Sequence, residues 1–377
     1  MIETMLVFDM DGVLIEPRGY HRALQETVRL IGHSLGFENP HMDQGTIHAF
    51  EAAGISSEWD TAAICLGVMM KEIWQQDPGA AIPTKLNPSP PGASLLQAPD
   101  WEGFLSRMGS YPADLDAPLQ KARELLNENL TESQRAALTG LMEGTYDVRG
   151  SLTNRVFQEL VLGSGPFQDT YQLTPWFDCG GYLQRFDRPL LTPQQVEQLK
   201  DLLGEKIRAA IVTNRPSQSP EEFVCSPEAE IGARALELAQ LPLVGFGDML
   251  WLSKKREEDI HDFLKPSPVH LLAALLQARG IPRKKALETA ANFAHHGLSG
   301  RQWQAYQGCT LYLFEDTTAG MRSATSAVQY LKDQGVEIEL ALIGIAADGQ
   351  KQGRLRSLGA RVYPALGEAL QALFGIR

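Results

Sequence analysis

Short apolar runs and helical apolar repeats alternate along much of this chain. Residues 5–8 predict a buried strand, and similar runs predict strands at 208–212, 309–314, 340–345 and 361–364. Apolar residues spaced three or four apart predict helices at 194–203, 268–279 and 321–334, with a closing helix at the C-terminus. This alternation is typical of an α/β fold with a parallel sheet covered on both faces.

The interval between these regions has a different pattern, because helical repeats fill most of it. Helices are predicted at 20–35, 47–74, 101–108, 118–129, 132–144 and 151–162, with Asp60 as the N-cap of 61–74. A loop rich in glycine and aromatic residues follows residue 162. Between residues 77 and 100 six prolines lie among glycine and serine, which predicts a long loop.

The two patterns predict two domains. We expect a discontinuous α/β core domain at 1–18 and 190–377 and an inserted, mostly helical domain at 19–189, with the Pro-rich loop at about 77–100. The length of 377 residues fits this division, and 44% hydrophobic and 21% charged residues are ordinary for a globular enzyme.

The charge limits the partners that we expect. A net charge of −12 argues against a nucleic-acid or anionic-membrane surface, which requires clustered Lys and Arg. No apolar run approaches the length of a membrane span. We therefore expect no nucleic-acid or membrane partner, and a monomer or homodimer.

The cysteines and the N-terminus bear on the compartment. Cys65, Cys179, Cys225 and Cys309 are widely scattered and lack metal-ligand spacing, so we expect reduced, structural thiols. The first strand begins within a few residues of Met1, which leaves no room for a signal peptide. These features predict a cytoplasmic protein.

Three predicted strands end on polar residues. The first ends on Asp9 and Asp11, the second on Thr213 and Asn214, and the third on Glu315 and Asp316. The carboxyl ends of parallel strands meet at one edge of a sheet, where ligands bind in open α/β folds. Lys265 stands directly before Pro266 at a predicted helix start.

These residue types suit phosphoryl transfer, which depends on positioning and on neutralising charge on the phosphoryl oxygens. Asp9 is the expected nucleophile, and Asp11 the general acid and then base. Thr213 and backbone N–H groups of the loop after it would hold phosphate oxygens, with Asn214 either assisting or shaping that loop. Lys265 would offset the charge of Asp9 and phosphate.

A divalent cation is also expected. Asp9 and Asp11 repel each other unless a cation lies between them, and hard oxygen ligands suit Mg²⁺. Glu315 and Asp316 would complete its octahedral site together with Asp9 and the Asp11 carbonyl. These acids can alternatively serve as strand-end or helix caps.

The four clusters together resemble the motifs of the haloacid dehalogenase superfamily. The matching segments, in the order that the family uses, are Asp9-Met10-Asp11-Gly12-Val13, Val212-Thr213-Asn214, Lys265-Pro266-Ser267-Pro268 and Glu315-Asp316-Thr317-Thr318-Ala319-Gly320. The resemblance covers about half the chain, residues 1–18 and 190–377. It implies a Rossmann-like core, an aspartyl-phosphate on Asp9 and Mg²⁺ dependence.

The long interval after the first motif resembles the helical C1 cap of subfamily I, which includes phosphoglycolate phosphatase and β-phosphoglucomutase. Residues 50–60 and 156–163, and Arg215-Pro216 after the threonine motif, look like a less studied branch of that subgroup. Arg215 is long enough to reach a substrate carboxylate or phosphate, although a surface role fits it equally. The segments 77–144 and 284–308 are longer than the family pattern, which leaves the substrate open.

The function predicted from the sequence is a Mg²⁺-dependent phosphatase acting on a small phosphorylated metabolite. A phosphomutase of the β-phosphoglucomutase type would use the same core. A dehalogenase needs no Mg²⁺, and Asp11 with Glu315 and Asp316 argues against it. A catalytically idle binding protein on the same scaffold is the alternative from another class.

Overall fold

The structure is a computed structural model that describes residues 3–55, 57–87, 96–110, 118–204, 206–221, 225–297 and 301–377. Parts of three predicted segments therefore lie outside the described residues, namely 88–95 of the Pro-rich loop, 111–117 of the segment 77–144, and 298–300 of the segment 284–308. The chain divides into two compact units, the α/β unit (Met1–Pro17 and Asp187–Arg377) and the helical unit (Arg18–Phe186).

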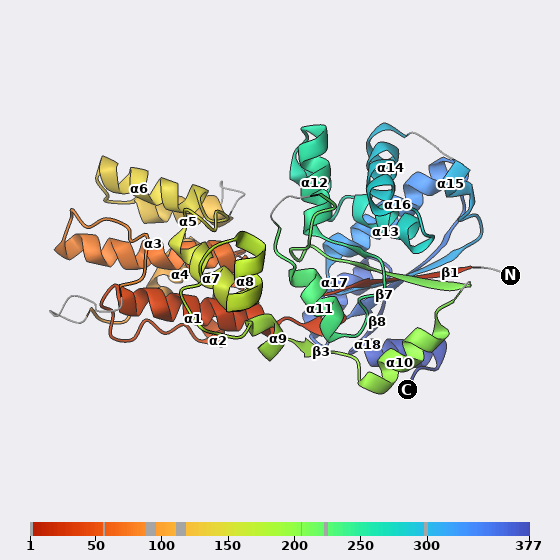
Figure 1. The fold of residues 1–377 in the computed structure, drawn as a ribbon, viewed down its shortest axis with the longest axis horizontal. Helices are drawn as coiled ribbons and strands as arrows, with labels where there is room; N and C mark the ends of the chain where they lie inside the picture. The colour runs from red at the N-terminus through yellow and green to blue at the C-terminus, as the bar shows by residue number, and fades with distance from the viewer. Residues whose placement is uncertain are drawn as a thin grey trace. The chain divides into compact units, whose positions relative to one another are not determined.

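The α/β unit contains a six-stranded sheet in which all neighbouring strands are parallel, so the predicted α/β class is confirmed (Figure 1). Its order is β5-β4-β1-β6-β7-β8. The strands are β1 (Thr4–Asp9), β4 (Ile207–Val212), β5 (Leu243–Val244), β6 (Thr310–Glu315), β7 (Glu339–Ile345) and β8 (Arg361–Tyr363). The chain proceeds from β1 to β4 and β5, then crosses back to β6. Its direction thus reverses at β1, the position where ligands bind in such sheets.

Alternating residues of β1 enter two separate cores. Met5 and Val7 belong to one core, with side chains of α12 (Phe246–Arg256), α13 (Val269–Ala278), α14 (Arg283–His296), α16 (Thr318–Asp333) and α17 (Gly349–Ser357). Leu6 and Phe8 belong to the other, with side chains of α10 (Pro193–Leu202), α11 (Glu228–Ala235) and α18 (Leu366–Phe374). Because successive side chains of a strand point to opposite faces, an all-apolar β1 is covered on both sides.

A two-stranded ribbon lies in the same unit. Strand β2 (Ile15–Glu16) pairs antiparallel with β3 (Arg188–Pro189), and Glu16 is opposite Arg188. The remaining short helices of this unit are η1 (Ile260–Asp262) and α15 (Arg301–Gln304). The ribbon therefore joins the segment that follows β1 to the segment that returns from the helical unit.

The helical unit consists of nine helices in its described residues: α1 (Arg18–Ser34), α2 (Gln44–Ala52), α3 (Glu58–Gln76), α4 (Trp101–Ser110), α5 (Pro118–Asn127), α6 (Glu132–Glu143), α7 (Leu152–Leu162), α8 (Ser164–Tyr171) and α9 (Tyr182–Phe186). Helix α1 packs against α3, α7 and α9, and α3 also packs against α5 and α6. Residues 77–87 and 96–100 form neither helix nor strand, apart from an isolated bridge between Leu96 and Phe37.

Three local predictions in the helical unit differ from the structure. Asp60 is not an N-cap, because α3 starts one turn earlier and the Ser57 hydroxyl accepts the Asp60 N–H bond at 3.2 Å. The helical pattern at 47–74 is broken near Gly54, whose φ of +88° a helix does not allow. The loop predicted after residue 162 contains α8 and α9, which bury too few apolar residues to give a clear repeat.

Candidate active site

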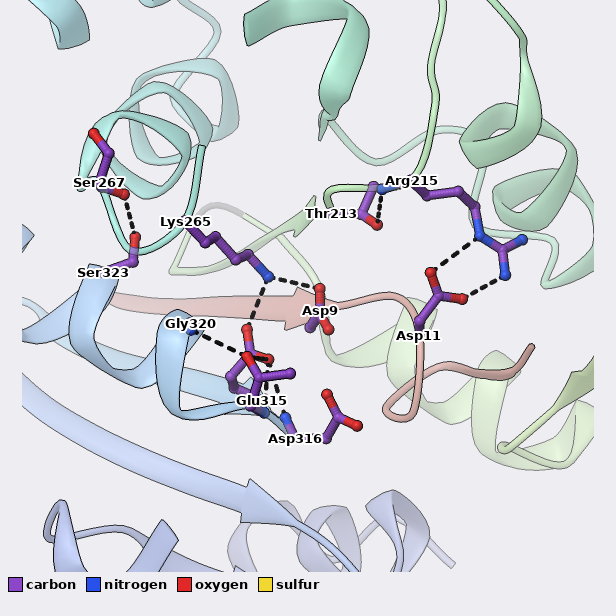
Figure 2. Close-up of polar contacts among 11 residues, drawn as sticks. Asp9, Asp11, Thr213, Arg215, Lys265, Ser267, Glu315, Asp316, Gly320 and Ser323 are labelled. Atoms are coloured by element: carbon purple, nitrogen blue, oxygen red, sulfur yellow. Dashed lines mark hydrogen bonds and ion pairs between the residues drawn. The ribbon is translucent and has the colours of Figure 1, made fainter. Parts of the chain in front are cut away.

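The carboxyl ends of β1 and β6 bring Asp9, Lys265 and Glu315 into direct contact (Figure 2). The Lys265 amine donates to Oδ1 of Asp9 at 2.7 Å and to Oε2 of Glu315 at 2.8 Å. Phe8 pairs with Phe314 in the parallel register, so the next residue of each strand, Asp9 and Glu315, reaches the same edge. Asp9 and Lys265 are separated by 256 positions in sequence, and strand register together with the loop before α13 places them side by side.

Glu315 is fully buried and uses its other oxygen to begin α16. Oε1 accepts hydrogen bonds from the backbone N–H groups of Asp316 (3.1 Å) and Thr317 (3.0 Å) and from the Thr317 hydroxyl (2.8 Å). Gly320 is required here, because a Cβ at that position would collide with the Glu315 carboxylate. Glu315 therefore orients Lys265 with one oxygen and the start of α16 with the other.

Asp316 faces the same space and forms an ion pair with Lys351 of α17. Gly12, in the turn after β1, has a φ of +75°, and a Cβ there would collide with the Asp316 carboxylate. The sequence pattern Asp-x-Asp-Gly thus serves two needs at Gly12, a left-handed backbone and close approach to Asp316.

Three carboxylates gather at this edge, and their arrangement suits a hard divalent cation. Oxygens of Asp9, Glu315 and Asp316 all lie within 4.8 Å of one another, and all three residues are buried. They face the amines of Lys265 and Lys351, so negative charge exceeds positive by one among these five groups when all three acids are ionised. Mg²⁺ takes oxygen ligands and is commonly bound through one or two carboxylates. Asp9 and Asp316 could hold such an ion, since Glu315 already satisfies both of its oxygens internally.

The pKa values of these groups reflect the crowding. Burial raises the pKa of Asp9 well above its usual value, and the Glu315 charge raises it further against the opposing effect of Lys265. Burial also raises the pKa of Asp316 to about 6, although Lys351 acts to lower it. For Lys265, burial acts to lower the pKa, but Asp9 and Glu315 together raise it above its ordinary value. The lysine is therefore charged near pH 7.

Asp11 lies in the turn after β1, and its side chain points toward Arg215 and away from Lys265 (Figure 2). Both of its oxygens receive N–H groups of that guanidinium, with 3.2 Å from Nε to Oδ2 and a second contact from Nη2 to Oδ1. Arg215 is fully buried and also pairs with Asp187 at 3.0 Å. The structure therefore places Arg215 beside Asp11, and a direct contact of Arg215 with substrate stays a prediction.

Thr213 and Asn214 follow β4, whose Val212 is opposite Asp9 in the register. Thr213 is buried; its N–H donates to the Val244 carbonyl at 3.0 Å, and its hydroxyl accepts from the Arg215 N–H at 3.0 Å. Asn214 is exposed. The strand register thus brings the threonine to the level of Asp9, while the phosphate-binding roles of both residues stay predictions.

Sequence reasoning missed three residues around this site. Lys351 follows β7. The same expectation that was used for the other strands, that residues after parallel strands lie at one edge of the sheet, would have found it. Asp187 carried no signal, because its partner is 28 positions away. His270 is fully buried in α13, where burial and then the Lys265 charge lower its pKa to about 3, so it is neutral near pH 7.

Comparison with known proteins supports the fold. No family model and no curated protein matches the chain. A crystal structure solved as a Northeast Structural Genomics Consortium target matches over 100% of both chains, with a TM-score of 0.61 and 18% identity. A phosphatase from Thermococcus thioreducens (Tt82) matches 94% of this chain and 99% of its own, with a TM-score of 0.43 and 15% identity. A hydrolase from Pseudomonas syringae covers 99% of both chains, with a TM-score of 0.34 and 14% identity.

These similarities do not all support a conclusion about this chain. The first shows a shared fold, and 18% identity says nothing of activity. The TM-scores of the other two are too low to support an argument. Within the described ranges, no helix has both the length and the apolar character that crossing a membrane requires.

Proposed function

We propose that this protein is a Mg²⁺-dependent phosphatase of the haloacid dehalogenase superfamily that acts on a small phosphorylated metabolite. The observation that carries the proposal is the contact of Asp9 with Lys265 beside Glu315 and Asp316, at the sheet edge where the chain direction reverses. The sequence motifs and the carboxylate cluster both point to this edge of the sheet. Asp9 is the proposed nucleophile because it is the acid that ends the central strand.

In the first half of the proposed reaction, a carboxylate oxygen of Asp9 attacks phosphorus. An O–P bond forms to Asp9, the bond from phosphorus to the leaving oxygen breaks, and Asp11 supplies the proton that this oxygen takes up. Lys265 holds Asp9 through Oδ1 and offsets its charge as the phosphoryl group approaches. Thr213 and the loop after it would orient the phosphoryl oxygens.

In the second half, water attacks the aspartyl-phosphate. Asp11 accepts a proton from the water, the bond between Asp9 and phosphorus breaks, and inorganic phosphate leaves. Asp9 and Asp316, with the Asp11 carbonyl, would hold the cation, and Glu315 would position Lys265. The chemistry that Mg²⁺ supplies when bound is neutralisation of charge on the phosphoryl oxygens.

Phosphate release from a panel of substrates tests the proposal. The panel holds p-nitrophenyl phosphate, sugar phosphates, phosphoglycolate, nucleotides and amino-acid-derived phosphates, each assayed with and without Mg²⁺. Wild-type protein should release phosphate in the presence of Mg²⁺, and Asp9→Asn should lower kcat by at least about 10³-fold, since the amide is a far weaker nucleophile.

Asp333→Asn is the matched control. Asp333 is an exposed acid at the end of α16, accepts a bond from Gln329 at 2.6 Å and should be replaceable without loss of activity. A mass increase of one phosphoryl group on wild-type protein, absent from Asp9→Asn, would support the covalent intermediate. Turnover in Asp9→Asn equal to wild type would reject the proposal, and isomer product in excess of released phosphate would instead indicate a phosphomutase.

A further inference from the structure

Arg215 bridges two carboxylates that are far apart in the sequence. Its Nη1 donates to Oδ2 of Asp187 at 3.0 Å, while Nε and Nη2 contact the two oxygens of Asp11. The side chains of Arg215 and Asp187 are 0% and 6% exposed, whereas that of Asp11 is 34% exposed. The guanidinium and Asp187 are thus enclosed, and Asp11 is the partner that has room to move.

The backbone fixes Arg215 and Asp187 in place. Asp187 directly precedes β3, which pairs with β2, and the Leu190 N–H donates to the Leu14 carbonyl at 2.9 Å. The Arg215 N–H donates to the Thr213 hydroxyl at 3.0 Å, and its carbonyl accepts from the Phe246 N–H at 3.2 Å. Asp11 by contrast lies in a turn whose next residue is Gly12. Arg215 and Asp187 are therefore held by the backbone around them, whereas Asp11 is more exposed.

The geometry of Asp11 does not match its proposed proton transfer. Both of its oxygens face Arg215 (Figure 2). The reacting oxygen would belong to a substrate held at Asp9. A general acid or base must come within hydrogen-bond reach of the proton that it transfers. Asp11 therefore has to turn at least one oxygen away from the guanidinium during the reaction.

That movement has a cost that Asp187 can reduce. Leaving a buried charge without its partner is strongly unfavourable. When Asp11 turns away, Asp187 remains paired with Nη1 and keeps a negative charge beside the buried guanidinium. Without the charge on Asp187, the attraction of Arg215 would act more strongly on Asp11 and hold it away from the leaving group.

We propose that Asp187 is a positioning residue for the reaction, which fixes Arg215 so that Asp11 can move between the guanidinium and the leaving group. This inference rests on the proposed phosphatase function. Along the chain, Asp187 is the first residue of the α/β unit after the helical unit.

The dependence of rate on the leaving group tests this role. Proton donation to the leaving group belongs to the first half of the reaction, which kcat/KM reports, and it matters most for poor leaving groups. Asp187→Asn should therefore lower kcat/KM for β-glycerophosphate about 10-fold more than kcat/KM for p-nitrophenyl phosphate. The ratio of the two kcat/KM values is independent of the folded fraction, so partial unfolding does not mimic the effect.

Two further variants complete the test. Asp187→Glu keeps the charge and should return the ratio toward the wild-type value, and Asp201→Asn, an exposed acid in α10, should leave it unchanged. An equal loss for both substrates in Asp187→Asn, no loss at all, or a Glu variant as impaired as the Asn variant would overturn the inference. Absence of phosphate release by wild-type protein from every substrate of the panel would instead reject the phosphatase function, and this inference with it.

Discussion

Glu315 in the α/β unit and Glu159 in the helical unit have similar surroundings. Each side chain is 0% exposed and lies beside a basic residue, Lys265 at 2.8 Å from Glu315 and Arg155 at 3.9 Å from Glu159. Each also accepts two backbone N–H bonds. For Glu159 these come from Trp176 at 3.0 Å and Phe177 at 2.6 Å.

The two sites differ in the residues that surround the ion pair. Arg155 lies over the rings of Phe167 (4.5 Å) and Trp176 (4.9 Å), and it donates to the Thr174 carbonyl at 2.5 Å. At that site one acid, Glu159, lies beside one base, Arg155, and aromatic rings cover the base. Glu315 instead has two more carboxylates within 4.8 Å, and the cluster has more acids than bases.

The difference teaches that a buried ion pair is weak support for a function by itself. Glu159 and Arg155 form a charge pair at 3.9 Å and hydrogen-bond the backbone of residues 174, 176 and 177, which is a structural task. The cluster around Glu315 keeps an unbalanced charge that a further cation would neutralise. The imbalance, at an edge of the sheet where ligands bind, is what distinguishes a candidate active site.

Replacing the two glutamates by glutamine is the sharpest test of this comparison. Glu159→Gln should lower the free energy of unfolding by about 3 kcal/mol, because it leaves Arg155 without its counter-charge. Glu315→Gln should lower it by less, because Lys265 keeps Asp9 as a partner. Mg²⁺ should raise the thermal unfolding midpoint of wild type and Glu159→Gln by mass action, but should have little effect on Glu315→Gln. Loss of the Mg²⁺ effect in Glu159→Gln at a temperature where it is folded would contradict the comparison.

Gly12→Ala should disturb the Asp316 side of the cluster. The new Cβ meets the Asp316 carboxylate and sits on a left-handed backbone, so the carboxylate has to move. We expect Mg²⁺ affinity, measured by isothermal titration calorimetry, to fall by about 10-fold or more. Gly353→Ala is the matched control, because it lies in α17 with no atom within 4 Å of the added Cβ. Equal Mg²⁺ affinity in both variants would show that Asp316 does not hold the ion.

Lys351→Gln should have the smallest effect, and in the opposite direction. Lys351 pairs with Asp316 from a side chain that is 42% exposed, so solvent screens part of its charge. Removing that charge should raise Mg²⁺ affinity by a few-fold, corresponding to about 1 kcal/mol or less, and the gain should shrink as salt is added. Arg354→Gln on the same helix is the control. Weaker Mg²⁺ binding in Lys351→Gln would mean that Lys351 supports the site instead of competing with the ion.

The sequence predicted the strands of the α/β unit well because their pattern is local. Mostly apolar runs predicted β1, β4, β6, β7 and β8 to within one or two residues, whereas the two-residue strand β5 was missed. The helices α8 and α9 were missed because short helices bury too few residues to reveal a period. Asp60 was mistaken for a cap because Ser57, one turn earlier, has an equally suitable side chain.

The sequence by itself determined the α/β class and which strand ends carry Asp9, Thr213, Glu315 and Asp316, because both follow from apolar periodicity and from the meeting of parallel strand ends at one edge. The contact of Lys265 with Asp9 was also expected from the sequence. Tertiary structure alone decided that Asp11 pairs with Arg215 and that Arg215 pairs with Asp187, because 204 positions separate Asp11 from Arg215. Such choices depend on charges enclosed together in a medium where leaving one unpaired is costly, and no spacing along a chain encodes that enclosure.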